Sequence, residues 1–360
     1  MNTNKSGRRR LGTIALAVTL SAALAACGNN ESSGSSGSPA PAGSAAPGAS
    51  APAKKETKTI KIGYLAVMDD AQAILAYEAG LYEKQGLKAE MTKFNSGTDL
   101  IKAIAGGQLD AGVLGFTNAL TWSAQGADLK VVGGAQMGFH SILVGKDSSI
   151  KSVADLKGKK LASQKPGSTA DVVLNGVALA KANLTNKDLD MKYVEPAAAI
   201  QALQAGQVDA AFVFEPFDKI AQKQFGAKPI YEVGKEWPFP CMVMITSNSV
   251  LKKDRDLINR ALDAQKEAIE MLQKDPQAAA DKITKHFIEG DSLDTPNGKV
   301  SAKEVIKESI ASQTFNWEIN PDQVKRMQEM ADIMQKQGAL DKPMKVEDIL
   351  DLSWQQSVKK

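Results

Sequence analysis

The chain has 360 residues, of which 43% are hydrophobic and 24% charged, a composition typical of a globular protein with room for two domains. Its formal net charge is +3, but the first 26 residues hold four basic residues (Lys5, Arg8, Arg9, Arg10) and no acid, which leaves −1 for the remainder. A near-neutral body excludes electrostatic binding of nucleic acid. Two cysteines and two histidines are too few for structural zinc sites, disulfide scaffolds or iron–sulfur clusters, and we expect no metal and no cofactor. The one long apolar run, residues 11–26, is shorter than the roughly 20 residues of a spanning helix, which excludes a multi-span membrane protein.

The N-terminus has the layout of an export signal, with a basic patch, an apolar stretch and then small residues. We expect a signal peptide over residues 1–26, cleaved before Cys27. The segment Leu24-Ala25-Ala26-Cys27 resembles the lipobox of bacterial lipoproteins, which implies that Cys27 is acylated and anchors the protein to the outer side of a cell membrane. A plain signal peptide with an incidental cysteine is the alternative. If Cys27 is lipidated, Cys241 has no intramolecular partner and is a free thiol.

Residues 27–56 consist almost wholly of glycine, serine, alanine and proline. Such a segment cannot bury enough apolar surface to offset the entropy of ordering, so we expect a flexible tether. A tethered domain works close to a membrane, which favours a partner in that membrane.

Strand-like and helical patterns alternate from residue 59 to about residue 250, which indicates an α/β protein with mostly parallel sheets. The first half predicts, in chain order, a strand at 60–65, a helix at 71–85, a strand at 88–94, a helix at 99–105 and strands at 111–114, 129–135 and 141–145. From Leu251 onward the pattern is helical, and a stripe of methionines at 327, 330 and 334 predicts a core face.

An internal repeat is the most informative feature of the sequence. Residues 101–111 (I-K-A-I-A-G-G-Q-L-D-A) match residues 200–210 (I-Q-A-L-Q-A-G-Q-V-D-A) at an offset of 99. At the same offset Lys61 aligns with Lys160, each at the start of a strand, and the loop at residues 68–70 aligns with the loop at residues 167–169. The repeat predicts two like-ordered α/β units.

Two such units joined by a hinge form a cleft between the carboxyl ends of their strands, where helix N-termini converge. We expect lobe 1 to comprise residues 57–146 and 239–360, and lobe 2 residues 147–238. In this arrangement residues 238–246 cross back into lobe 1 as a strand, and the helical tail packs on lobe 1.

Four segments carry a likeness to a known family: G-Y-L…A-Y-E-A-G-L-Y-E-K-Q-G-L (63–87), G-G-Q-L-D-A-G (106–112), L-K-G-K-K-L-A-S-Q-K-P-G-S-T (156–169) and A-G-Q-V-D-A-A-F-V-F-E-P (205–216). With the lipobox and tether, the chain resembles the solute-binding lipoproteins of bacterial ABC importers, of the nitrate/sulfonate/taurine type that shares its fold with thiamine-pyrimidine binders. The resemblance implies a type II periplasmic-binding-protein fold whose two lobes close around a small solute and deliver it to a permease driven by an ATPase. We expect the protein to be a monomer.

Two loops, residues 96–98 (Ser-Gly-Thr) and 167–169 (Gly-Ser-Thr), each follow a strand and open a helix. Free backbone N–H groups, hydroxyls and the positive end of a helix dipole suit an anion. Ordinary N-capping by serine and threonine is the alternative.

Other candidates carry two interpretations each. The resemblance makes Glu215 a cleft residue, which either holds a cationic group or locks hinge hydrogen bonds. Asp69 and Asp70 either cap the helix at Ala71 or hold an amine, and His140 either donates to an anion or is structural. The candidate ligand-binding residues are Met68, Asp69, Ser96, Gly97, Thr98, Phe116, Thr117, Asn118, His140, Gly167, Ser168, Thr169 and Glu215.

No arginine stands between Arg10 and Arg255, so neither unit's loops supply the bidentate guanidinium that a doubly charged phosphate or sulfate favours. We expect a small anionic or zwitterionic solute, such as nitrate, an alkanesulfonate or a taurine-like compound. A binder of a neutral heterocycle such as a thiamine pyrimidine precursor, and a ligand-sensing lipoprotein domain, are the alternatives. Yeast-type pyrimidine synthases share the fold but carry a cysteine-rich stretch where this chain has only Cys241, and we expect neither catalytic residues nor enzymatic activity.

Overall fold

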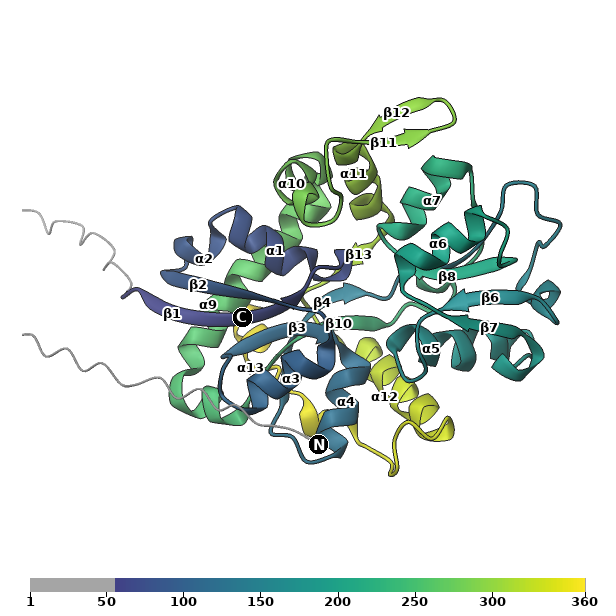
Figure 1. The fold of residues 1–360 in the computed structure, drawn as a ribbon. Helices are drawn as coiled ribbons and strands as arrows, with labels where there is room; N and C mark the ends of the chain where they lie inside the picture. The colour runs from purple at the N-terminus through teal and green to yellow at the C-terminus, as the bar shows by residue number, and fades with distance from the viewer. Residues whose placement is uncertain (1–55, 360) are drawn as a thin grey trace, which may run out of the picture. The chain divides into compact units, whose positions relative to one another are not determined.

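The computed structural model describes residues 56–359, and its described elements build two main sheets (Figure 1). The expected signal peptide, the lipidation of Cys27 and nearly all of the expected tether lie outside the described residues. Within residues 56–359, no helix is both long enough and apolar enough to cross a membrane.

The first sheet has six strands in the order β13-β4-β10-β3-β1-β2. Strand β1 pairs in parallel with β2 and β3, whereas β10 is antiparallel to both β3 and β4, and β13 is antiparallel to β4. The strands are β1 (Lys58–Leu65), β2 (Leu87–Phe94), β3 (Ala111–Gly115), β4 (Lys130–Met137), β10 (Pro240–Thr246) and β13 (Thr314–Phe315).

The second sheet has five strands in the order β7-β6-β8-β5-β9. Strand β6 pairs in parallel with β7 and β8, and β5 is antiparallel to β8 and β9. The strands are β5 (His140–Val144), β6 (Lys160–Ser163), β7 (Asp190–Tyr193), β8 (Ala210–Phe214) and β9 (Lys228–Glu232). Five strands of the first sheet therefore repeat in the same order and direction in the second, which confirms the predicted duplication and the two-sheet α/β architecture.

Helices follow most strands and cover the sheets (Figure 1). The α-helices are α1 (Ala71–Glu78), α2 (Leu81–Lys84), α3 (Gly97–Ala105), α4 (Phe116–Ala124), α5 (Thr169–Val173), α6 (Pro196–Gln204), α7 (Phe217–Phe225), α8 (Val233–Glu236), α9 (Asn248–Lys274), α10 (Pro276–Ile283), α11 (Ala302–Ser312), α12 (Pro321–Lys336) and α13 (Ser353–Val358). A 3₁₀ turn, η1 (Met68–Asp70), precedes α1, and a π-helical segment, η3 (Leu174–Leu179), continues α5.

The 99-residue offset extends to individual hydrogen bonds. The backbone N–H of Lys61 donates to Asp110 Oδ2 over 2.8 Å, and the N–H of Lys160 donates to Asp209 Oδ2 over the same distance. Each aspartate thus joins a central strand, at Lys61 within β1 and at Lys160 at the start of β6, to the residue that precedes its parallel neighbour. These aspartates are the last but one residues of the two repeated segments, which explains why the repeat includes them.

One expected strand belongs to the other sheet. Residues 141–145 were expected in the segment 57–146 of lobe 1, but His140–Val144 pairs with β8 and β9 of the second sheet. The chain therefore crosses between the sheets at Gly138 and Phe139, before this strand. It crosses back before β10, where the Gly138 N–H donates to the Phe239 carbonyl over 2.7 Å and so joins the two crossing segments.

The single helix expected over residues 71–85 is broken at Gly80, whose φ of 69° is left-handed and starts the short helix α2. The tail also differs from the expected helices packed on lobe 1. It contains a hairpin of β11 (Ser292–Thr295) and β12 (Gly298–Ser301), and α11 packs against α7 beside the second sheet. The methionine stripe is confirmed, because Met327, Met330 and Met334 of α12 are fully buried in the core.

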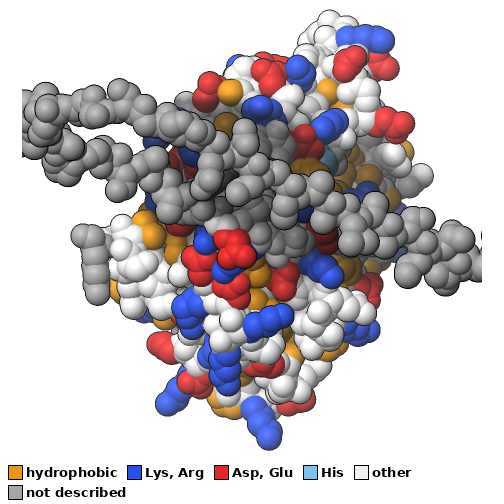
Figure 2. Space-filling view, turned by 90° about the vertical axis from the view of Figure 1, so that its left-hand side faces the viewer, with side chains coloured by type: hydrophobic (Ala, Val, Ile, Leu, Met, Phe, Trp, Pro, Cys, Tyr) orange, Lys and Arg blue, Asp and Glu red, His pale blue; other side chains and the backbone are white. Residues whose placement is uncertain are grey.

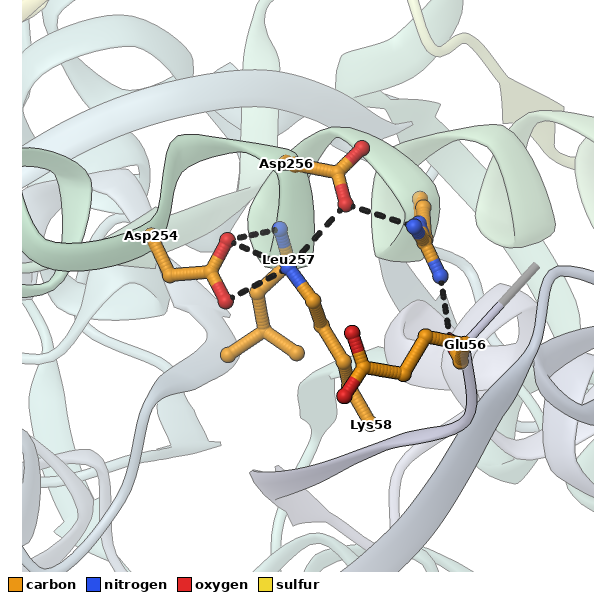
Figure 3. A network of polar contacts seen from close by, with 6 residues as sticks. Glu56, Lys58, Asp254, Asp256 and Leu257 are labelled. Carbon is orange, nitrogen blue, oxygen red and sulfur yellow. Dashed lines mark hydrogen bonds and ion pairs between the residues drawn. The ribbon is translucent and has the colours of Figure 1, made fainter.

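An ion-pair network fixes the first strand to α9 (Figure 3). Lys58 Nζ lies 2.8 Å from Asp254 Oδ2 and 3.2 Å from Asp256 Oδ2. Arg260 joins Asp256 over 2.8 Å and donates to the Glu56 carbonyl over 2.9 Å. Asp254 interrupts α9 with non-helical angles, and its carboxylate accepts the N–H of Leu257, so it caps the part of the helix that follows.

The face shown in Figure 2 mixes acidic and basic side chains over its described residues, in keeping with the near-neutral charge of the body.

We predict that Asp110→Ala and Asp209→Ala each lower the free energy of unfolding by about 1 kcal/mol, because each removes the side-chain acceptor of a backbone N–H in a central strand. Urea unfolding followed by circular dichroism measures both variants, with Asp341→Ala, at an exposed position, as the control. Equal stability of all three variants would contradict the paired role of the two aspartates.

Candidate functional site

The candidate site lies where loops of the first sheet meet the second. The hydroxyls of Thr117, in the first turn of α4, and Thr169, the first residue of α5, lie 2.6 Å apart and share a hydrogen bond. Helix α4 follows β3 of the first sheet and α5 follows β6 of the second. The carboxyl ends of β3 and β6, one strand from each sheet, therefore approach each other here.

Two glycines allow this close approach. A Cβ on Gly115 would lie 2.9 Å from Thr169 Oγ1 and 3.3 Å from Asn118 Nδ2, and a Cβ on Gly97 would lie 3.1 Å from the same amide nitrogen. Gly97, Thr117, Asn118 and Thr169 of the predicted site are therefore brought together. Gly115 was missed by sequence reasoning, although a glycine at the end of a buried strand before a helix is a signal of close backbone approach.

The two predicted serines are helix caps. Ser96 Oγ accepts the N–H of Asp99 over 3.2 Å and donates to its carboxylate over 2.8 Å, and Ser168 Oγ accepts the N–H of Asp171 over 3.2 Å. The N-capping alternative is thereby confirmed for both. The Gly167 N–H donates a hydrogen bond to Asp171 Oδ2 over 2.8 Å. Thr98 is exposed. A ligand role for these loops stays a prediction.

Of the two interpretations of Asp69 and Asp70, capping of α1 is wrong. Asp70 occupies the N-cap position of α1 without a capping hydrogen bond, because its Oδ2 accepts the Leu65 N–H over 2.7 Å at the end of β1. Asp69 is 5% exposed and Asp70 is fully buried, and the Oδ1 atom of each has no hydrogen-bond partner within the described chain. Burial raises the pKa of Asp69 to about 7 and raises the pKa of Asp70 well above its usual value.

Two buried glutamines near these aspartates were not predicted. Gln72, on α1, is fully buried and neither atom of its amide has a partner among the described residues. Gln136, on β4, donates to Gln313 Oε1 over 2.9 Å, while its own carbonyl oxygen is unpartnered there. The available signal is a glutamine inside an otherwise apolar segment, as in A-Q-A-I-L-A and G-G-A-Q-M.

Three other candidates lie in apolar surroundings. Met68 is fully buried in the core and Phe116 is 1% exposed. His140 is 3% exposed and stacks on Phe212 with ring centroids 5.5 Å apart. Burial lowers the pKa of His140 to about 4, so its ring is neutral at pH 7 and offers an anion an N–H group but no charge.

Glu215, at the end of β8, is held by α11. Ser312 Oγ donates to Glu215 Oε1 over 2.7 Å and Ser309 Oγ donates to Oε2 over 2.9 Å, while the Lys219 N–H donates to Oε2 over 3.3 Å. Both carboxyl oxygens are therefore engaged, which favours the locking interpretation over the holding of a cation. Burial and the nearby charge of Asp218 raise the pKa of Glu215 to about 8.

A separate cavity of about 870 Å³ lies beside the loop at residues 166–167 and helix α5, which Thr169 begins. It is lined by residues 166–167, by residues of α5 and η3 and by the end of α12, where Gln337 Nε2 donates to the Val172 carbonyl over 3.1 Å. Residues 56–359 contain no cluster of three or more histidine, cysteine, aspartate or glutamate side chains arranged to hold a metal ion.

The raised pKa of Glu215 predicts a pH-dependent stability. The folded state keeps a proton that the unfolded state loses above its ordinary pKa of 4.5, so the free energy of unfolding falls as the pH rises from about 4.5 to about 8. Glu215→Gln, which cannot ionise, reduces this slope without abolishing it, because Asp69 and Asp70 titrate in the same direction.

Urea unfolding at pH 5.5, 7.0 and 8.5 measures the slope, with Glu289→Gln, at an exposed position, as the control. Ser312→Ala is expected to cost about 1–3 kcal/mol at each pH, since it removes a hydrogen bond to a buried carboxyl group. A slope that Glu215→Gln leaves unchanged would contradict the assigned titration.

The sequence and the fold were compared with those of known proteins. The NMT1-like family matches residues 53–287. A provisionally assigned aliphatic sulfonates-binding protein of Bacillus subtilis is 28% identical over 334 residues, which cover 91% of each chain. The solved alkanesulfonate-binding protein of Xanthomonas axonopodis, bound to MOPS, is 25% identical with a TM-score of 0.68 and covers 83% of this chain and 100% of its own.

A desulfurization enzyme of known structure is more distant, at 14% identity and a TM-score of 0.60 over 84% of this chain and 99% of its own, and it shows a shared fold alone. Because the family match spans more than half of the sequence, the chain belongs to the NMT1-like family.

Proposed function

We propose that this chain is the extracytoplasmic solute-binding component of an ABC importer and that it captures a small organic sulfonate between its two sheets for delivery to a membrane permease. The observation that carries the proposal is the contact between Thr117 and Thr169, which places the start of α4 from the first sheet against a hydroxyl from the second. The sulfonate-binding relatives support the solute class.

The start of α4 lies beside the start of α3. Asn118 is close to both Gly97 and Gly115, so its amide and the Thr117 hydroxyl lie beside the N-termini of two nine-residue helices, α3 and α4. Helix N-termini and neutral donors suit an anion of single charge. The absence of arginine from residues 11–254 disfavours an oxyanion of double charge.

The chain crossings suggest how the solute is enclosed. Each sheet with its helices acts as a lobe in this proposal, and the segments around Gly138 and Phe239 are the hinge. The threonine hydroxyls, one from each lobe, then part to admit the solute and both donate to it when the lobes close. Solute and closed form thereby stabilise each other.

The sequence also supports a place outside the cytoplasmic membrane. Cys27 follows an export signal, and acylation there anchors the protein within reach of a permease. The protein in this proposal acts as a receptor, and no chemistry is assigned to it.

Thr169→Val is predicted to weaken sulfonate binding about 10- to 150-fold, since it removes one hydrogen bond to a charged group, worth about 1.5–3 kcal/mol. Gly115→Ala is predicted to weaken it at least about tenfold, because its Cβ would lie 2.9 Å from Thr169 Oγ1 and hold the lobes apart. Isothermal titration calorimetry with ethanesulfonate and taurine measures both variants.

Gly145→Ala is the matched control, because its Cβ would meet no atom within 4 Å. Wild-type affinity in both Thr169→Val and Gly115→Ala, with the melting temperature of each unchanged, would place the solute elsewhere.

For the anchor, Cys27→Ser is predicted to move the protein from the membrane fraction to the soluble fraction, or to leave it as the uncleaved precursor. Fractionation and immunoblotting of cells that express the wild type and the variant measure this. Partition of the variant into the detergent phase to the same extent as the wild type would overturn the lipid anchor.

A further inference from the structure

A chain of hydrogen bonds, largely buried, runs from the second sheet to the first. Glu215 directly follows β8 of the second sheet, and its two carboxyl oxygens lie 2.9 Å from Ser309 Oγ and 2.7 Å from Ser312 Oγ of α11. The Ser309 carbonyl accepts Gln313 Nε2 over 3.0 Å, and Gln313 Oε1 accepts Gln136 Nε2 over 2.9 Å. Gln136 lies on β4 of the first sheet. These five residues are here called the bridge network.

Helix α11 is anchored to the first sheet. Three of its buried side chains lie in the hydrophobic cluster of that sheet, which contains Ile60 and Ile62 of β1. The three are Val305, Ile306 and Ile310. Strand β13 begins two residues after the end of α11 and pairs with β4, which fixes the C-terminal end of the helix as well. The contacts that α11 makes with the second sheet are therefore contacts between the two halves of the fold.

The geometry of the bridge network suits a neutral carboxyl group at Glu215. The Ser312 hydroxyl has a single hydrogen but two acceptors within reach, Glu215 Oε1 at 2.7 Å and the Ser309 carbonyl at 3.0 Å. With an ionised carboxylate, the two acceptors compete for this hydrogen. With a neutral acid, the carboxyl group donates to Ser312 Oγ and the hydroxyl donates to the carbonyl. Glu215 Oε2 then accepts from Ser309 Oγ and from the Lys219 N–H, so both oxygens are satisfied.

The charges around Glu215 leave it close to neutrality. Burial and then Asp218 raise the pKa of Glu215, to about 8, although Lys219 and the two serines act in the other direction. The charged side chains of α11 are paired elsewhere: Lys303 with Asp281, Lys307 with Glu304 and Glu308 with Lys223 of α7. The remaining titratable group on the elements around Glu215 is His140 of β5, whose ring is neutral at pH 7.

Resting on the movement of two lobes in the proposed function, we propose that the bridge network is a proton-dependent latch. Neutral Glu215 fastens the second lobe to α11 in the closed form, and loss of its proton releases that lobe. The structure shows the closed form, since Thr117 and Thr169 are in contact while the bridge network is complete. Opening takes Glu215 away from the two serines and into water, where its carboxyl group ionises readily.

Linkage gives the direction of the pH effect. Opening moves Glu215 from surroundings in which its pKa is about 8 to water, where its ordinary pKa is 4.5. Between these two values the open form binds fewer protons than the closed form, so the ratio of closed to open protein falls as the pH rises. One proton changes this ratio by up to about tenfold per pH unit. Outside this range Glu215 has the same charge in both forms, and its effect on the ratio is constant.

Pulsed electron spin resonance tests the latch on the full-length protein in detergent, without solute. Spin labels are attached through Glu83→Cys on α2 and Gln204→Cys on α6, two exposed positions beside different sheets. The labelled wild type gives the background from Cys27 and Cys241. The distance that marks the open form is expected to gain population as the pH rises from 5.5 to 8.5.

Two variants in the labelled protein separate the proton from the contact. Glu215→Gln is expected to stay closed at every pH, because its amide donates to Ser312 as the neutral acid does and cannot ionise. Ser312→Ala is expected to raise the ratio of open to closed protein at least about fivefold at pH 5.5, because it removes a hydrogen bond to a buried group. Glu289→Gln, at an exposed position, is the control and keeps the wild-type response. The melting temperature of each variant shows that it is folded.

An equal pH response in the wild type and in Glu215→Gln would overturn the latch. A single distance distribution at every pH, unchanged by Ser312→Ala, would overturn it too. Neither result bears on solute capture, which calorimetry with sulfonates decides separately. Conversely, a latch that responds to pH as expected in a protein that binds no sulfonate would stand while the sulfonate class of the proposed function fails.

Discussion

The structure depends on two strands, β5 and β10, each of which directly follows a crossing of the chain and completes the sheet that the chain enters. The chain passes from the first sheet to the second before β5, which lies between β8 and β9. It returns before β10, which lies between β3 and β4. Each strand is antiparallel to both neighbours and buried. Without β10 the strands β3 and β4 would have no backbone partner between them, and without β5 the same would hold for β8 and β9. One buried cluster contains residues of both sheets, among them Val113 and Phe212, so the two sheets also share part of their hydrophobic core.

The ends of the strands present two kinds of electrostatic surroundings. Around Thr117 and Asn118, helix N-termini and hydroxyls supply donors. Buried oxygens of Asp69, Asp70, Gln72 and Gln136 have no hydrogen-bond partner among the described residues. Glu215 is a buried acid of another kind, because two serine hydroxyls of α11 already occupy its oxygens. The difference between satisfied and unsatisfied acids separates a structural lock from a candidate for binding, although burial raises the pKa of all three carboxyl groups.

Features with a local or repeated pattern were predictable from the sequence. The repeated G-Q-hydrophobic-D-A segment predicted both units, because a duplicated fold keeps the same hydrogen bonds at Asp110 and Asp209. Strand β5 was assigned to the wrong sheet, since an apolar run has the same pattern whichever neighbour accepts its hydrogen bonds. The break at Gly80 was missed because the residues around it are helical in pattern. The site was predictable only in part: hydroxyl-bearing loops were visible, but the meeting of Thr117 with Thr169 depends on tertiary packing.

The Lys58 network has a mechanical consequence. It lies at the start of β1, and η1, with Asp69 and Asp70, follows the far end of that strand, roughly 26 Å away at about 3.3 Å per residue. A force applied to Glu56 along β1 would first act on the ion pairs of Lys58 and Arg260. It would then load the parallel hydrogen bonds of β1 with β2 and β3 together, in shear. Since these pairs are partly exposed, salt weakens them, and the resistance of this end of the protein to force then rests on the sheet itself.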